Sequence, residues 1–128
     1  MSVKFATIDD VARVASTPPG RQPQPGTIIL DVRTREEVGK TGRIPGAVHI
    51  PIADLVLTFV DPRVKRVEGA ATWPPPKESE ILVHCLMGAR AKRATAALLA
   101  LGYRNASCFE GGWQEWEKSS HHHRKSKL

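Results

Sequence analysis

The chain has 128 residues, of which 41% are hydrophobic and 25% charged, a composition typical of one globular domain. Its formal net charge is +6, but Lys118, Arg124, Lys125 and Lys127 lie in a final segment without acidic residues, and the rest is nearly balanced. We therefore expect no nucleic-acid partner. No apolar run could span a bilayer, and the first residues lack the apolar centre of a signal peptide, so we expect a soluble intracellular domain without a membrane partner.

The first third of the chain predicts two helices around one buried strand. Residues 7–16 begin with a possible Thr7 cap and continue as a short amphipathic helix. A loop rich in proline and glycine covers 17–26. The β-branched run "TIILDVR" at 27–33 is typical of a strand buried on both faces, and one or two helical turns follow at 34–40.

The middle of the chain is more irregular. We expect a short strand at 47–50, a helix at 53–60 and a long irregular connection at 61–79, which ends in three prolines. A second buried strand is predicted at 80–85, a third at 106–112 and a closing helix at 113–119.

A longer helix follows Cys85. Its apolar face has helical spacing, and Gly102 is placed to end it in a left-handed cap; the face comprises Ala91, Ala94, Thr95, Leu98 and Leu101. Strands that alternate with helices predict an α/β domain with a central, mostly parallel sheet flanked by helices on both faces. We assign residues 1–118 to this domain and 119–128 to a flexible basic tail.

The joint between the strand at 80–85 and this helix carries the clearest functional signal. Ligands of open α/β sheets bind at the carboxyl ends of strands, and a helix N-terminus favours negative charge. A thiol there is shifted toward the nucleophilic thiolate. Gly88 lets the loop amides converge, and Arg90 adds a donor fork suited to an oxyanion. We therefore predict a site where Cys85 attacks or carries an anionic group.

Three stretches resemble the single-domain rhodanese-like sulfurtransferases, in that family's order. "ILDVRTREEVGKTGRIPGAVHIP" (29–51) is similar to the first signature, and "ILVHCLMGARAKRATAALLALGY" (81–103) to the active-site stretch Cys-x-x-Gly-x-Arg with its helix. "FEGGWQEWEKS" (109–119) resembles the closing Gly-Gly-x-x-x-Trp helix, with Trp116 at the tryptophan position.

The resemblance implies a rhodanese-like fold and a sulfur-transfer reaction. Cys85 would take a sulfane sulfur from thiosulfate or a similar donor, hold it as a persulfide, and pass it to cyanide or a thiol. The loop amides would stabilise the negative sulfur, and Arg90 would steer the donor; the anion site comprises Leu86, Met87, Gly88, Ala89 and Arg90. Members of this family need no metal or organic cofactor.

Two other functions remain open. Rhodanese-fold phosphatases and arsenate reductases resemble this chain, but their loop has five residues between cysteine and arginine, whereas four separate Cys85 from Arg90. His84 echoes the phosphatases, although strand alternation turns its side chain away from Cys85, which favours a core or supporting role. The remaining alternative is a module that binds a partner or relays sulfur between proteins.

The other candidate residues have mainly structural interpretations. Asp31 and Arg33 end a buried strand near Cys85, and we expect an ion pair that supports the loops. Glu110 could approach the site or cap the closing helix. The two cysteines lack CxxC spacing, which favours reduced thiols, and Cys108 is predicted to be an inert core thiol. Trp113 and Trp116 would pack one helix face on the sheet, with His49 a packing residue.

The chain ends in Ser126-Lys127-Leu128, the tripeptide read as a peroxisomal address. A receptor reads this signal on a free, flexible end, and the basic residues upstream are compatible with it. We therefore expect an import receptor as a partner, and a location in peroxisomes or in related organelles such as glycosomes.

Overall fold

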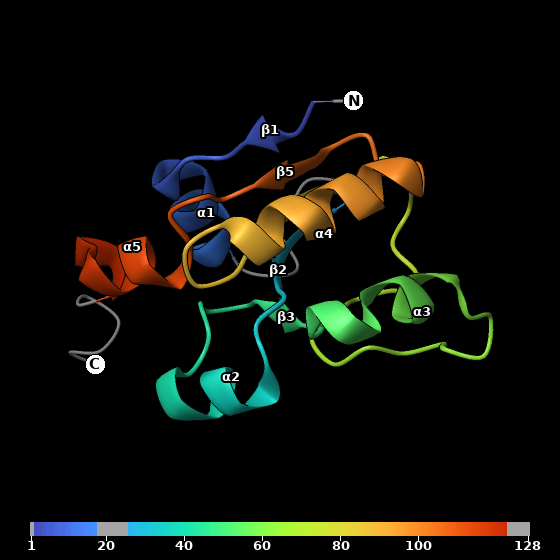
Figure 1. Cartoon of the computed structure of the whole chain (residues 1–128), viewed down its shortest axis with the longest axis horizontal. Helices are drawn as coiled ribbons and strands as arrows, with labels where there is room; N and C mark the ends of the chain where they lie inside the picture. The colour runs from blue at the N-terminus through green and yellow to red at the C-terminus, as the bar shows by residue number, and fades with distance from the viewer. Residues whose placement is uncertain (1, 18–25, 123–128) are drawn as a thin grey trace.

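The structure is a computed structural model that describes residues 2–17 and 26–122. Five parallel strands form one sheet in the order β1-β5-β4-β2-β3. They are β1 (Lys4–Phe5), β2 (Thr27–Asp31), β3 (Val48–His49), β4 (Glu80–His84) and β5 (Ala106–Cys108). β1 and β3 form the two edges (Figure 1). The predicted α/β class and parallel sheet are confirmed.

Helices cover both faces of this sheet. They are α1 (Ile8–Ala15), α2 (Arg35–Thr41), the 3-10 helix η2 (Ile52–Asp54), α3 (Leu55–Val60), α4 (Ala89–Ala100) and α5 (Gly112–Lys118). α4 crosses in front of the strands in Figure 1. Within the described residues, none of these helices is long and apolar enough to cross a bilayer.

Two hydrophobic clusters show which helices share a face. Side chains of α3 and α4 pack with one set of residues in and next to the strands, including Cys108 of β5 and Cys85 just after β4. Side chains of α1 and α5 pack on the opposite face, against Ile29 and Leu82. Since neighbouring strand residues point to opposite faces, His84 and Cys85 belong to different layers.

Local signals explain several element boundaries. Thr7 begins α1 with a reciprocal capping box to Asp10, as predicted, and Thr34 begins α2 in the same way with Glu37. The buried face of α4 has the predicted periodicity, and Gly102 follows that helix with φ +97°.

The structure differs from the sequence-based predictions at β1 and at the end of β5. β1 is not predicted from the sequence, since both of its residues are exposed and show no alternation. The strand predicted at 106–112 is wrong beyond Cys108, because Phe109 begins a turn closed by the Gly112 amide on the Phe109 carbonyl. Residues 61–79 contain no helix or strand, as expected. Residues 18–25 of the predicted loop and the tripeptide Ser126-Lys127-Leu128 lie outside the described residues.

Candidate active site

Cys85 directly follows β4 and begins a sharp turn into α4. Gly88 is the N-cap of that helix and has φ +108°. A Cβ atom at Gly88 would lie 2.8 Å from the carbonyl oxygen of Glu110, so a larger residue would displace the loop or the turn beside it. The predicted strand–loop–helix geometry is therefore present, and its conformation depends on glycine.

The sulfur of Cys85 faces the N-terminus of α4. The amide of Gly88 donates to Sγ at 3.1 Å, and that of Ala91 donates at 3.3 Å. Of the predicted loop amides, Gly88 thus reaches the sulfur, and Ala91, one residue beyond the predicted set, does so as well. Two donors and the positive end of a helix dipole favour negative charge on this atom. The side chains of Leu86, Met87 and Ala89 are exposed.

The loop carbonyls point the other way, toward α5. The amide of Trp113 donates to the carbonyl of Cys85 at 2.8 Å, and that of Gln114 donates to the carbonyl of Leu86 at 3.2 Å. A Cβ atom on Gly112 would come within 2.5 Å and 2.6 Å of these two oxygens. The first turn of α5 therefore holds the peptide groups of the loop in the orientation that presents amide hydrogens to the sulfur.

Arg90 is engaged with a carboxylate that the sequence did not indicate. Its Nη1 lies 2.6 Å from Oε1 of Glu37, and its Nη2 lies 2.9 Å from Oε2. The backbone amide of Thr34 also donates to Glu37, at 2.9 Å. The hydrogen bonds from Arg90, followed by those from Thr34, lower the pKa of Glu37 to about 2. A two-point ion pair therefore lies beside the predicted anion site.

A buried polar network lies behind Cys85, on the α1 and α5 side of the sheet. Arg33 and Asp31 form the predicted ion pair, with Nη2 2.8 Å from Oδ2. His84, beside Asp31 in the sheet, is fully buried. Its Nδ1 lies 3.2 Å from the Cys85 carbonyl and its Nε2 lies 3.7 Å from Asp31 Oδ2. Since a carbonyl only accepts, Nδ1 carries the hydrogen, and His84 supports the loop from behind.

The remaining candidates pack around the loop, and the carbonyl oxygen of Glu110 lies 2.8 Å from where a Cβ atom on Gly88 would be. Of the two roles considered for Glu110, the helix cap is wrong, because α5 has no side-chain cap and the Glu110 carboxylate pairs with Lys92 at 2.8 Å. Cys108 is buried, and burial raises its thiol pKa to about 11, with the nearby Cys85 contributing. Trp113 and Trp116 pack in the core, as predicted.

Two histidines have contacts beyond simple packing. His49 places Nε2 2.7 Å from the carbonyl oxygen of Arg33, so it contributes a polar contact to the same region. At the start of the predicted tail, His121 stacks on Trp116. The part of the chain that the structure describes contains no cluster of three or more His, Cys, Asp or Glu residues that could hold a metal ion.

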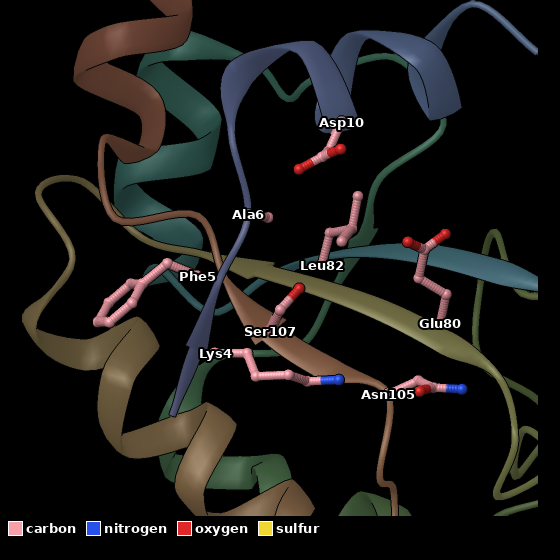
Figure 2. Close-up of a pocket in the computed structure, with 8 residues that line it drawn as sticks. All are labelled: Lys4, Phe5, Ala6, Asp10, Glu80, Leu82, Asn105 and Ser107. Atoms are coloured by element: carbon pink, nitrogen blue, oxygen red, sulfur yellow. The ribbon is translucent and has the colours of Figure 1, made fainter. Parts of the chain in front are cut away.

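A separate pocket of about 440 Å³ lies between α1 and the sheet (Figure 2). Its lining comprises Lys4, Phe5, Ala6, Asp10, Glu80, Leu82, Asn105 and Ser107. Glu80 begins β4, whereas Cys85 follows the end of that strand, so the two sites lie at opposite ends of β4. The carboxylates in the pocket already pair with Thr7 and Arg13 of the same protein. This pocket is not part of the site at Cys85.

Comparisons with known proteins agree on one family. The model of the rhodanese-like domain matches residues 20–119. The human thiosulfate:glutathione sulfurtransferase is 35% identical over 94 residues, which cover 72% of this chain and 81% of that protein. The mouse thiosulfate sulfurtransferase/rhodanese-like domain-containing protein 3 is 32% identical over 89 residues, covering 70% of this chain but 57% of the mouse protein. A solved human single-domain sulfurtransferase superposes with a TM-score of 0.74 at 30% identity, covering 93% of this chain and 100% of that structure.

Proposed function

Because this chain belongs to the rhodanese-like domain family of sulfurtransferases, we propose that Cys85 is the residue that carries the transferred sulfur. It takes a sulfane sulfur from thiosulfate or a similar donor and passes it to cyanide or a thiol. The observation that supports this proposal most directly is the pair of hydrogen bonds from the Gly88 and Ala91 amides to Sγ.

The first half of the reaction is a displacement at sulfur. The Cys85 thiolate attacks the outer sulfur of thiosulfate and forms a new S–S bond. The original S–S bond breaks, and sulfite leaves with its electron pair. The terminal sulfur of the persulfide then carries one negative charge. The amides at the start of α4 point to Sγ, so they favour the thiolate that begins this attack, and the terminal sulfur is bonded to the atom that they contact.

The second half returns the enzyme to its starting state. Cyanide or the thiolate of an acceptor attacks the terminal sulfur of the persulfide, and the S–S bond to Cys85 breaks. The electron pair stays on Sγ, which becomes a thiolate again. The same amides therefore stabilise the thiolate that begins the first half and that is released again in the second.

Intact-protein mass spectrometry after incubation with thiosulfate tests this function. We expect the wild type to gain one sulfur atom, to lose it again on addition of cyanide, and Cys85→Ser to gain none. An unmodified wild type that hydrolyses a phosphate ester would instead favour the phosphatase alternative. Loading without turnover, together with stable binding of a sulfur-carrying protein, would favour a relay.

A further inference from the structure

The net charge of the side chains beside the sulfur is close to zero, although the sequence places an arginine there. Both Nη atoms of Arg90 contact the carboxylate of Glu37, and the two side chains are only 25% and 30% exposed. Thr34 holds the same carboxylate through its amide and hydroxyl groups. Glu37 is thus fixed in its charged form, and it offsets the positive charge that would otherwise attract a dianion.

The exposed part of the loop is apolar. Leu86 and Met87 follow Cys85 directly, and their side chains are 37% and 64% exposed. Large apolar side chains on a protein surface commonly mark a place where an apolar partner or ligand binds. A donor that reaches Cys85 therefore meets a neutral ion pair together with two apolar side chains.

From these two features we infer that the site prefers sulfur donors that carry one negative charge and an organic substituent, with Glu37 as the residue that discriminates against dianions. This inference rests on the proposed function and names its donor class. A dianion such as thiosulfate is repelled by the Glu37 carboxylate more strongly than a monoanion is. An organic substituent gains contact with Leu86 and Met87, which the third oxygen of thiosulfate, in the same position, cannot provide.

Organic thiosulfonates represent this donor class, and the transfer from them balances. The Cys85 thiolate attacks the outer sulfur of R–SO₂–S⁻, a new S–S bond forms, and the S–S bond of the donor breaks. A sulfinate, R–SO₂⁻, leaves with the electron pair. Two negative charges are present before and after the step, and no oxidant or reductant is consumed.

The test compares kcat/KM for thiosulfate and for benzenethiosulfonate, with cyanide as the acceptor. We expect the wild type to prefer benzenethiosulfonate. Glu37→Gln should improve kcat/KM for thiosulfate by roughly three- to fivefold relative to benzenethiosulfonate, mainly through KM. Glutamine preserves the capping-box hydrogen bonds to Thr34, so α2 should remain intact. Glu36→Gln is the matched control, since it removes the same charge from a side chain that is 81% exposed.

A second pair of variants tests the apolar surface. Met87→Ser should lower kcat/KM for benzenethiosulfonate several-fold more than it lowers kcat/KM for thiosulfate. Leu57→Ser is its control, because Leu57 lies on α3 and is 65% exposed, about the same as Met87 at 64%. For that control we expect no change in kcat/KM for either donor.

The outcomes separate this inference from the function on which it rests. A wild type that transfers sulfur from both donors but prefers thiosulfate would overturn the inference and leave the proposed function intact. The same holds if Glu37→Gln and Glu36→Gln shift the donor ratio equally. If the wild type transfers sulfur from neither donor, both the inference and the proposed function are contradicted. Inhibition of the wild type by benzenesulfonate and by sulfate provides a measurement that needs no variant: tighter inhibition by sulfate would contradict the inference.

Discussion

The guanidinium of Arg33 lies against the carboxylate of Asp31 inside the core, with Nε 3.1 Å from Oδ1 and Nη2 2.8 Å from Oδ2. Asp61 and Arg63 form the same arrangement two residues apart, with matching contacts of 3.1 Å and 2.8 Å. The first pair is buried, whereas Arg63 is exposed to solvent. The chain therefore contains one ion-pair geometry in two dielectric environments.

Asp31→Asn should destabilise the protein by about 3–5 kcal/mol, because it leaves the buried guanidinium of Arg33 without a compensating charge. Asp61→Asn should change stability little, since water solvates Arg63 when its partner is removed. Urea denaturation of both variants measures the difference. Equal losses of unfolding free energy in the two variants would mean that burial does not determine how much this ion pair contributes to stability.

Gly88→Ala should reduce turnover by about two orders of magnitude, because the new Cβ would meet the Glu110 carbonyl and move the loop amides from the sulfur. Gly102→Ala is the control: its φ is also positive, at +97°, but its Cβ would contact only the Lys77 side chain at 3.7 Å. Both variants should lose about 1 kcal/mol of stability from backbone strain. Steady-state rates and thermal melting distinguish the two effects, and full activity in Gly88→Ala would contradict this account of the loop.

Cys108→Ser should leave loading of sulfur from thiosulfate largely intact. Burial raises the pKa of this thiol to about 11, so almost none of it is thiolate near neutral pH. Mass spectrometry of the variant after incubation with the donor gives the result. A loss of loading as complete as that expected for Cys85→Ser would show that Cys108 takes part in transfer.

The stability of the wild type should fall as the pH drops below about 6.5, in part because of His84. Burial lowers the pKa of this side chain below its ordinary value of 6.5, so the unfolded chain binds a proton there before the folded protein does. His84→Phe removes this contribution and should flatten the slope between pH 7 and pH 5. Urea midpoints at several pH values measure it; an unchanged slope would show that His84 does not contribute.

Ser126-Lys127-Leu128 should direct a fluorescent fusion to peroxisomes or glycosomes when they form its carboxyl terminus. Deletion of the tripeptide should leave the signal diffuse. Fluorescence microscopy with an organelle marker provides the comparison. Identical diffuse signals with and without the three residues would contradict the prediction.

Local patterns in the sequence predicted those parts of the fold that depend on nearby residues. The period of α4 identified Ala94 and Leu98 as core residues, and the capping pattern identified the start of α1. Gly88 marked the joint beside Cys85 because a turn into a helix often requires a positive φ. These features arise within a few residues of chain.

Tertiary contacts account for what the sequence did not predict. Glu37 meets Arg90 across 53 positions; the capping-box spacing from Thr34 distinguishes Glu37 from Glu36 but does not predict the contact with Arg90. The amide of Ala91 reaches the sulfur only because the loop curls back on itself. Glu110 suggested a helix cap, but the nearby Lys92 of α4 binds its carboxylate.

The first turn of α5 fixes the peptide groups of the loop through the carbonyls of Cys85 and Leu86. The polar surroundings of the sulfur are therefore assembled from main-chain amides, which every amino acid except proline supplies. Side chains at 86, 87 and 89 point to solvent and can be exchanged without dismantling those surroundings. Positions 86, 87 and 89 can therefore be varied together to select for new sulfur donors, whereas Gly88 and Gly112 must be kept.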